Sequence, residues 1–354
     1  IPLCLLSVLV MPLSETLAQF IIMFCIESVQ LIWHYLTYLS IQPWAVIELA
    51  KLYVQLLVIG GGLSVVILFF QPIITSNYRY VIALLCCSAF IFGVLRINES
   101  QSNTLKNWQL VVFDVGQGLS VLIERDNKAI LYDTGASYPS GFNMVEAAVL
   151  PYLQYAGIQK LDKVIISHSD NDHAGGVKVL QQSIPIAELI FNSSKNSNSP
   201  CQQGKAFNWQ GLTIEMLWPE EVVAKENDDS CVLLISDGKH KVLLTGDISK
   251  KVEAKLIAQY PKLQADVLVV PHHGSKTSSS NAFISQLKPQ LAIVSAGFLN
   301  RWHMPVVDVV QRYQVNNIQL LNSAKSGQIV ISFADKGMRY QTYQDDLWPF
   351  WFSN

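Results

Sequence analysis

The chain has 354 residues, of which 50% are hydrophobic and 15% are charged, and its formal net charge at pH 7 is −2. This balance excludes a basic field over the whole molecule, so any contact with nucleic acid has to depend on a local patch. The charges are unevenly distributed, since residues 1–95 hold five of the 52 and residues 96–354 hold the other 47. We therefore expect the two parts of the chain to lie in different solvents.

Three apolar segments of the first part are candidates for crossing a membrane, near residues 1–24, 52–74 and 80–95. The second has 23 residues without a charge, which is long enough for a hydrocarbon core about 30 Å thick. Residues 27–50 are apolar and aromatic but carry a histidine and two glutamates, which fits an interfacial or re-entrant helix better. Buried helices of a large soluble core are the alternative. Residues 1–96 are thus predicted to be the C-terminal part of a membrane domain, and the start at Ile1 suggests a longer protein.

The residues around the last apolar segment bear on the orientation. Arg79 lies in the short link between the last two segments, and basic residues favour the cytoplasmic side of a membrane. Everything after Arg96 is then expected on the outer face, beginning with a polar linker at residues 97–107. Cys201 and Cys231 are the only cysteines of the polar part, and they can pair if it faces an oxidising compartment.

Beyond the linker the pattern changes to short strands separated by turns. Strands are expected within residues 108–118, 120–135, 163–168, 212–218, 231–247, 265–274, 291–297 and 327–333. Asp126-Asn127 is a hairpin signal inside the second of these runs. Helical spacing occurs at residues 143–157, 172–182, 250–260, 282–288 and 306–314. Clustered strands with interspersed helices predict two sheets whose outer sides are covered by helices.

Several of the predicted strands end in a side chain that could bind a metal. The candidates are Asp114, Asp133, the cluster His168-Ser169-Asp170-Asn171-Asp172-His173, Asp247, His272, His273 and His303. Loops at the ends of rigid strands are where scaffolds usually present chemistry. A single histidine such as His303 is more often a solvated side chain than a ligand. The cluster is different, because a divalent cation is the simplest stabiliser of so many neighbouring carboxylates and imidazoles.

Six ordered motifs resemble those of one family. They are "FDVGQG" (113–118), "LYDTG" (131–135), "ISHSDNDHAGG" (166–176), "ENDDSCVLLI" (226–235), "LLTGD" (243–247) and "PHHGSKTSSS" (271–280). Together they look like the metallo-β-lactamase fold, an αββα sandwich with a two-metal site at one edge. Their order is similar to that in the ComEC family of competence channels, in which this domain follows transmembrane helices. The resemblance covers essentially the whole chain and implies such a domain at residues 108–345.

The resemblance also implies a set of metal ligands. They are His168, Asp170, Asp172, His173, Asp247 as the acid that bridges both metals, and His273, with His272 as second choice. The wider fold has a further histidine before the bridging acid, where this chain has Asn227-Asp228-Asp229-Ser230. One metal is then held less tightly, or Asp228 or Asp229 substitutes. Carboxylates in place of imidazoles favour harder metals, so we expect two divalent ions, Mn or Zn, with Mn favoured.

Other residues are expected to act on the substrate. Ser275 and Lys276 could hold a phosphate, and Asp172, His303 and Lys276 are the candidate catalytic groups, with His303 as a proton donor. Arg301 and Trp302 offer charge and a stacking face for a single strand. The alternatives are a solvated lysine at position 276 and a core tryptophan at position 302.

The resemblance implies a metal-dependent nuclease, a hydrolase of phosphodiesters, at the mouth of a DNA-import channel. It would cut the strand not taken up during natural transformation. Its partners would be single-stranded or incoming double-stranded DNA, the lipid bilayer, the rest of the channel and other competence proteins. The protein would cross the inner membrane several times, with the C-terminal domain on the periplasmic face. A catalytically weak DNA-guiding module and a hydrolase of another ester are the alternatives. The aromatic tail, residues 346–354, could rest on the membrane interface or pack on the domain.

Overall fold

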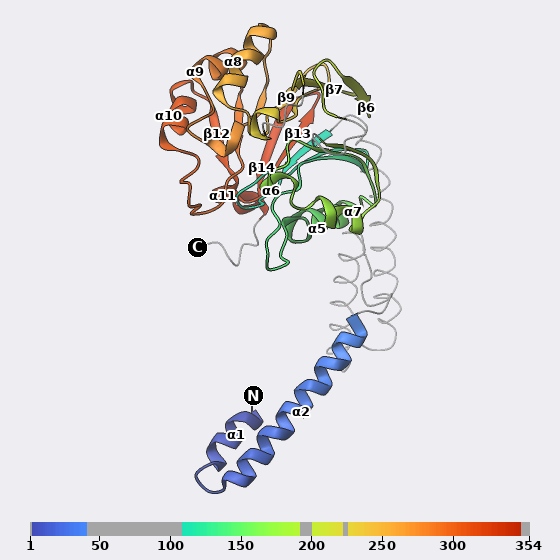
Figure 1. Cartoon of the computed structure of the whole chain (residues 1–354), viewed down its shortest axis with the longest axis vertical. Coiled ribbons are helices and arrows are strands. Elements are labelled where there is room, and N and C mark those ends of the chain that lie inside the picture. Colours follow the sequence, from blue (N-terminus) through green and yellow to red (C-terminus); the bar gives the residue numbers. More distant parts are fainter. Residues whose placement is uncertain (1, 41–107, 192–199, 222–225, 348–354) are drawn as a thin grey trace, which may run out of the picture. The chain divides into compact units, whose positions relative to one another are not determined.

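The computed structural model of the chain describes residues 2–40, 108–191, 200–221 and 226–347. The chain divides into two units at a boundary outside these ranges, so the N-terminal helices and the C-terminal domain are described separately (Figure 1). The apolar segments near 52–74 and 80–95, the linker 97–107 and most of the tail 346–354 lie outside the described residues.

The N-terminal unit contains two consecutive helices, α1 (Pro2–Val10) and α2 (Glu15–Ser40). Pro12 lies between them, and proline ends a helix because its ring clashes with the preceding turn. Ser14 Oγ accepts the Leu17 N–H at 3.3 Å and so caps the start of α2. Within the described residues one helix is long and apolar enough to cross a membrane, over Glu15–Leu36.

These bounds differ from the expected ones. The segment near residues 1–24 is divided at residues 11–14, and residues 27–40 continue the same helix. The physical reason is that residues 15–40 contain neither proline nor glycine, so nothing in their backbone ends the helix before Ser40.

The C-terminal domain contains two seven-stranded sheets. The first has the order β14-β13-β1-β2-β3-β4-β5. Its strands are β1 (Trp108–Val112), β2 (Val121–Arg125), β3 (Lys128–Tyr132), β4 (Leu161–Ile166), β5 (Ile186–Phe191), β13 (Ile329–Ala334) and β14 (Gly337–Thr342). Only β3–β4 and β4–β5 pair in parallel. The predicted hairpin at Asp126-Asn127 is confirmed, with φ of 54° and 57° as a type I′ turn requires.

The second sheet has the order β12-β11-β10-β9-β8-β7-β6. Its strands are β6 (Ala206–Trp209), β7 (Leu212–Trp218), β8 (Val232–Ser236), β9 (Lys241–Leu244), β10 (Val267–Val269), β11 (Leu291–Val294) and β12 (Gln319–Asn322). Strands β6 to β9 pair antiparallel, and strands β9 to β12 pair in parallel. Strands β10 and β11 are buried along their whole length, as is usual for parallel strands covered on both faces.

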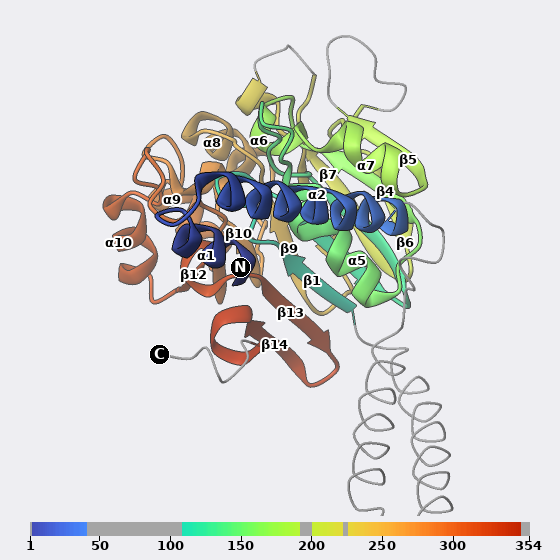
Figure 2. The same cartoon turned by 90° about the horizontal axis from the view of Figure 1, so that it is seen from below.

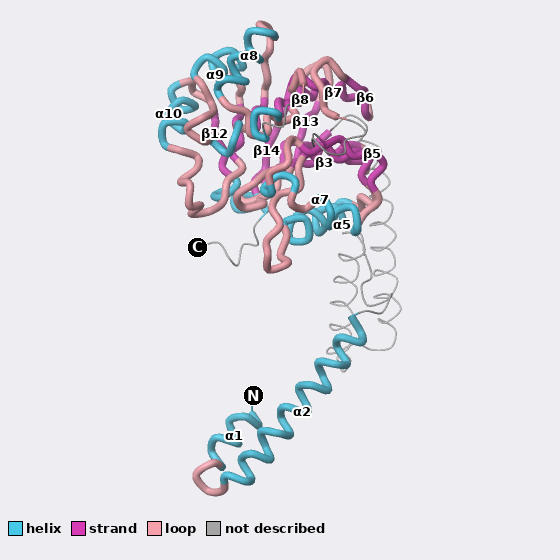
Figure 3. Tube along the Cα trace, in the orientation of Figure 1, coloured by secondary structure: helices cyan, strands magenta, loops and turns pink. Residues whose placement is uncertain are grey.

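Helices cover the outer face of each sheet (Figure 3). On the first sheet they are the π-helical turn η1 (Val145–Val149), α5 (Leu150–Ala156) and α7 (Val177–Ser183); on the second they are α8 (Lys250–Gln259), α9 (Asn281–Leu287) and α10 (Val307–Val315). Short turns complete the domain: α6 (Asn171–Ala174), η2 (Glu226–Asp229), η3 (Pro271–Gly274), α11 (Ser323–Ser326) and η4 (Tyr343–Leu347). The predicted αββα sandwich is therefore confirmed.

The alternation of side chains in β1 explains how the layers pack. Trp108, Leu110 and Val112 lie in the core between the sheets, whereas Val111 packs under the helices of the first sheet. Trp108 stacks on Phe333 of β13 with ring centroids 3.9 Å apart. Truncating such a buried aromatic to alanine typically costs about 3–5 kcal/mol. Figure 2 shows the β13–β14 hairpin at the edge of the first sheet, beside β1.

Candidate metal centre

The predicted ligands lie on loops that leave parallel strands of both sheets. His168 and Asp170 follow β4, and α6 carries Asp172 and His173. Asp247 follows β9 in the second sheet, and His273 lies in η3, directly after β10. Because β4, β9 and β10 all end at one edge of the sandwich, residues from positions 168 to 273 meet there.

Four of these residues form a compact group, which we call the inner cluster: Asp172, His173, Asp247 and His273. One ligand atom from each lies within 4.8 Å of the others. His173 Nε2 is 3.1 Å from Asp247 Oδ1, and His273 Nε2 is 3.4 Å from both Asp247 Oδ2 and Asp172 Oδ2. The two Nε2 atoms are 3.3 Å apart. Two imidazoles and two carboxylates thus point at one common space.

Each imidazole of the inner cluster is held through its other nitrogen. His173 Nδ1 is 2.8 Å from Asp133 Oδ2, and His273 Nδ1 is 2.8 Å from the carbonyl oxygen of Ser295. An acceptor at Nδ1 fixes the ring and leaves Nε2 free to bind a metal. Asp133 is itself fixed, because it accepts the Ser167 N–H at 2.6 Å and the Ser167 hydroxyl at 2.7 Å.

The charges of the inner cluster are strongly coupled. Burial alone would lower the pKa of His173, but the carboxylates of Asp247 and Asp133 raise it well above its usual value. Burial is likewise outweighed at His273, where Asp247 and Asp172 raise the pKa to about 9. Burial would raise the pKa of Asp247, yet the two imidazoles hold it well below its usual range. A divalent cation would take the place of the shared protons, since metal ligands have to be deprotonated.

The other two predicted ligands, His168 and Asp170, form what we call the outer pair. His168 Nε2 is 3.6 Å from Asp170 Oδ2. The His168 ring is buried, with Nδ1 at 3.0 Å from Ser167 Oγ and 3.3 Å from Ser230 Oγ. The Asp170 side chain is 36% exposed. Nδ1 of His168 therefore faces hydroxyl groups, whereas Nδ1 of His173 faces a carboxylate and Nδ1 of His273 faces a backbone carbonyl.

His168 Nε2 is buried and has no hydrogen bond in the described part of the chain, whereas Asp247 Oδ1 lies 3.1 Å from His173 Nε2. A buried polar atom without a hydrogen bond is costly, so His168 Nε2 needs an explanation such as an ion. Ser230 joins the two residues, because its hydroxyl accepts the Asp247 N–H at 2.9 Å and contacts His168. The residues of the inner cluster therefore fit a divalent ion, and His168 Nε2 offers a further ligand atom without a hydrogen bond.

The backbone around the ligands is tightly shaped. His272 and His273 both have left-handed conformations, with φ of 51° and 52°, which are uncommon outside glycine. The His272 N–H donates to the Gly246 carbonyl at 3.1 Å, which ties this turn to the loop of Asp247. Gly118 packs so closely on α6 that a Cβ there would lie 2.4 Å from the carbonyl oxygen of Asp172. Any other residue at position 118 would displace that ligand segment.

Of the residues expected to act on the substrate, Asp172 belongs to the inner cluster, and the others do not. Ser275 is buried, with its hydroxyl 3.0 Å from Thr277 Oγ1, and Lys276 is exposed. Arg301 lies over the Trp302 ring at 4.2 Å, and Trp302 is 47% exposed, which excludes the core tryptophan considered above. His303 is exposed.

Asp114 and Asp133 were candidate ligands because each follows a strand. Asp114 instead accepts the Gly116 N–H at 3.3 Å within its own turn and does not belong to the inner cluster. Asp133 contacts Nδ1 of His173 and so orients that ring, without belonging to the inner cluster itself.

The segment that lacks the expected imidazole takes other roles. Asp228 Oδ1 accepts the Ser249 N–H at 3.1 Å, just before α8. Asn227 Nδ2 lies 3.4 Å from His272 Nε2, which is itself 3.7 Å from Asp247 Oδ2. Burial lowers the pKa of His272, so this imidazole is neutral more readily than its neighbour.

The sequence did not predict the roles of Ser167, Ser230 and Ser295, which contact residues of the site through a hydroxyl group or a backbone carbonyl. Ser167 and Ser230 lie within two of the six motifs, and this position is the feature of the sequence that could have indicated a role in the site. Ser295 follows β11, and its contact with His273 depends on the packing of strands β10 and β11, which the sequence pattern does not specify.

Comparison with known proteins agrees with this geometry. Residues 113–297 match the Metallo-beta-lactamase superfamily. The chain is 41% identical over 275 residues to Recombination protein 2 of Haemophilus influenzae, covering 76% of this chain and 33% of that protein. It is 34% identical to Competence protein ComA of Neisseria gonorrhoeae (66% and 33% covered) and 31% identical to ComE operon protein 3 of Bacillus subtilis (66% and 34%).

The chain thus spans about a third of the length of the curated relatives it matches. The superfamily match covers more than half of the chain, including the six motifs from "FDVGQG" to "PHHGSKTSSS". The fold implies that the Asp and His cluster binds divalent metal. The resemblance to the ComEC family is confirmed by the three competence and recombination proteins, and the chain belongs to the metallo-β-lactamase superfamily.

Proposed function

We propose that the C-terminal domain is a two-ion nuclease of a DNA-import channel, which cuts the strand that is not taken up. The observation that carries the proposal is the carboxylate-rich cluster, which contains Asp172 and Asp247, with Asp170 as a further proposed ligand. Hard oxygen ligands favour Mn²⁺ over Zn²⁺, and pairs of divalent ions are typical of enzymes that cleave phosphodiesters. The competence proteins among its relatives support DNA as the substrate.

The chain's own residues would divide the work as follows. Two divalent ions, when bound by the inner cluster and the outer pair, supply an activated water and neutralise charge on the phosphodiester. Asp133 and Ser295 keep both inner imidazoles aligned. Ser275 and Lys276 follow His273 on the same loop and would hold a phosphate by a hydroxyl and a point charge.

His303, which is exposed, is proposed to give a proton to the leaving oxygen. The Arg301–Trp302 pair is proposed to contact the strand, with a guanidinium for phosphate and a ring for a base.

The disulfide between Cys201 and Cys231 supports a position on the outer face of the membrane. Their Cα atoms are 5.8 Å apart, and both residues are buried between the sheets. Disulfides persist in oxidising compartments and are rare in the cytosol. Protease added to intact spheroplasts should therefore digest the domain; full protection there, with digestion after lysis, would contradict this orientation.

Cleavage by the full chain in detergent, with Mn²⁺ and single-stranded DNA, tests the activity. We expect cleavage that the isosteric substitution Asp172→Asn abolishes. Asp126→Asn is the matched control, because Asp126 lies in the β2–β3 turn, where asparagine tolerates the left-handed backbone. Absence of cleavage by the unaltered chain, or cleavage that survives Asp172→Asn, would overturn the nuclease proposal.

A second candidate is a catalytically weak module that guides DNA. It is favoured by the segment at 227–230, which offers Ser230 and no imidazole beside His168. Fewer than one bound ion per chain, together with intact DNA binding, would support this candidate over the nuclease.

A further inference from the structure

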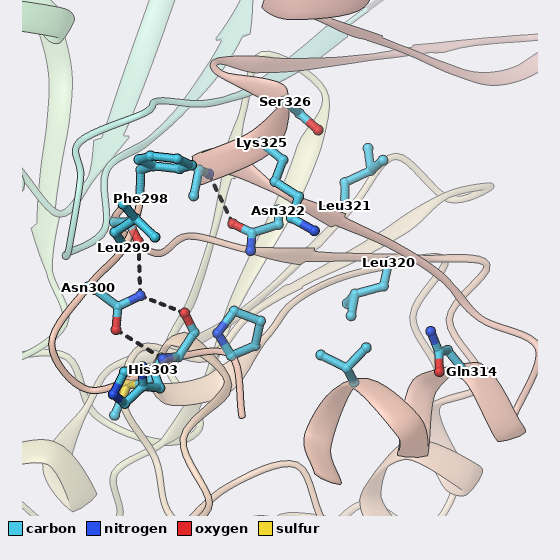
Figure 4. Close-up of a pocket in the computed structure, with 15 residues that line it drawn as sticks. Phe298, Leu299, Asn300, His303, Gln314, Leu320, Leu321, Asn322, Lys325 and Ser326 are labelled. Atoms are coloured by element: carbon cyan, nitrogen blue, oxygen red, sulfur yellow. Dashed lines mark hydrogen bonds between the residues drawn. The ribbon is translucent and has the colours of Figure 1, made fainter. Parts of the chain in front are cut away.

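A cavity of about 540 Å³ is lined by residues outside the set of proposed ligands (Figure 4). Its walls come from the loop 297–305, α10, β12 and α11. The volume falls within the range of about 300–1,000 Å³ that small-molecule sites occupy. None of the six ligands lines it, so the metal centre does not account for it.

The wall formed by the loop 297–305 is in contact with the segments that carry metal ligands. Gln117 Oε1 accepts the Gly297 N–H at 3.3 Å, and the next residue, Gly118, packs on Asp172. At the other end of the loop, a Cβ on Gly274 would lie 2.6 Å from Pro305 Cβ, and Gly274 directly follows His273. A molecule in the cavity would therefore contact a loop that packs on the segments of Asp172 and His273.

The lining of the cavity combines apolar side chains with amide groups and an ammonium group. Leu320, Leu321 and Phe298 supply apolar surface, and Asn322, Gln314 and Lys325 supply two amides and an ammonium. Asn322 Oδ1 accepts the Ala324 N–H at 2.9 Å, which leaves Nδ2 as a donor. Figure 4 shows the Lys325 side chain extending from α11 toward Asn322, with Leu320 and Gln314 on the far side.

We propose that this cavity binds an unpaired base of the DNA strand, next to the phosphate that is cut. The inference rests on the proposed function. A base has two apolar faces and an edge of donors and acceptors, which apolar walls with Asn and Gln amides match. Lys325 would contact the adjoining phosphate. The loop beside the cavity is also suited to a single strand, because Phe298 is 74% exposed and Trp302 47% exposed.

A base in a duplex cannot enter such a cavity without unpairing, which costs free energy. The cavity would therefore make the domain prefer single-stranded over double-stranded DNA. An apolar side chain of a partner protein is the other conceivable occupant, and it would give no dependence on bases.

Binding measured without cleavage tests the proposal. The full chain in detergent is titrated, in EDTA, into a fluorescent single-stranded oligonucleotide and into one of equal length with abasic positions. We expect Gln314→Ala to weaken binding of the normal strand by up to about tenfold, as for one lost hydrogen bond, and to leave the abasic strand unaffected. Gln311→Ala is the matched control, since Gln311 is exposed on the same helix but does not line the cavity.

Asn322→Ser gives a second variant, because a serine hydroxyl can cap α11 in place of the amide oxygen and the substitution removes the Nδ2 donor without adding a charge. It should also weaken the normal strand selectively. Equal binding of both strands by all variants, or equal weakening of both strands, would overturn the base site. Selective weakening in EDTA without any cleavage in Mn²⁺ would refute the nuclease alone, whereas cleavage without base dependence would refute the cavity's role alone.

Discussion

The inner cluster and the outer pair are the two parts of the proposed centre, and the protein supports them differently. In the inner cluster, His173 and His273 are buried, and each directs Nδ1 to a strong acceptor, a carboxylate or a carbonyl. In the outer pair, His168 has only hydroxyls near Nδ1, and Asp170 is partly exposed. Because partners of this kind orient ligands and raise their basicity, the inner position is organised before an ion arrives.

The difference implies two unequal affinities. The first equivalent of metal should bind at the inner cluster, and the second should depend on His168, Asp170 and the shared carboxylate of Asp247. Substitutions at these residues should either remove the difference between the two metal affinities or enlarge it.

The largest effect is expected at Asp247, because its carboxylate contacts both inner imidazoles and its backbone is tied to His168 through Ser230. Asp247→Asn should remove both equivalents of metal and reduce cleavage well beyond the roughly 100-fold cost of losing an orienting partner. Metal content by mass spectrometry and cleavage rate measure this. Asp335→Asn, at an exposed residue, is the control. Retention of two ions would contradict the bridging role.

A smaller effect, confined to the inner cluster, is expected at Asp133. Asp133→Asn weakens the acceptor for His173 Nδ1 while asparagine tolerates the left-handed backbone, where φ is 59°. The affinity for the first equivalent should fall about 10–100-fold. Isothermal titration with Mn²⁺ separates the two equivalents. A weaker second equivalent with an unchanged first would reverse the assignment of the two positions.

Asp170→Asn should act on the outer pair alone. The side chain makes no capping hydrogen bond to α6, so the fold does not depend on it. Bound Mn²⁺ should fall from about two ions to about one per chain at concentrations that saturate the unaltered chain. An unchanged stoichiometry would show that Asp170 is not a ligand.

The smallest effect is expected at Ser230. Ser230→Ala removes the hydroxyl that accepts the Asp247 N–H and contacts His168, so the second equivalent should bind about two- to tenfold more weakly. Cleavage at limiting Mn²⁺ should slow and should recover at high Mn²⁺. The same change at exposed Ser285 should have no effect. A loss that excess Mn²⁺ fails to rescue would argue for a structural role.

Local patterns predicted much of the domain. The alternation from Trp108 to Val112 places a strand between two apolar layers, and the left-handed turn at Asp126-Asn127 follows from residue type. The spacing from His168 to His173 indicated a metal site because the ligands lie within one turn and its loop. In each case the information lies within a few residues.

Contacts between distant segments were beyond such patterns. Asp133 looked like a ligand because it ends a strand, but only the pairing of β3 with β4 places it behind His173. The carbonyl of Ser295 has no side-chain signature at all. In the N-terminal unit, charge and aromatic content suggested a change of helix after Phe24, whereas the backbone continues to Ser40 because no residue breaks it.

The pairing of β1 with β13 has a consequence for the order in which the protein is made. β1 begins at Trp108 and is synthesised first, but its partner spans Ile329–Ala334, more than 200 residues later. Until that hairpin emerges, the β1 edge exposes unpaired backbone and Trp108 lacks the ring on which it stacks. All six ligands have then already been translated, so a chain cut short before Ile329 carries every ligand without a finished first sheet. The first sheet can therefore be completed only after every proposed ligand has been translated.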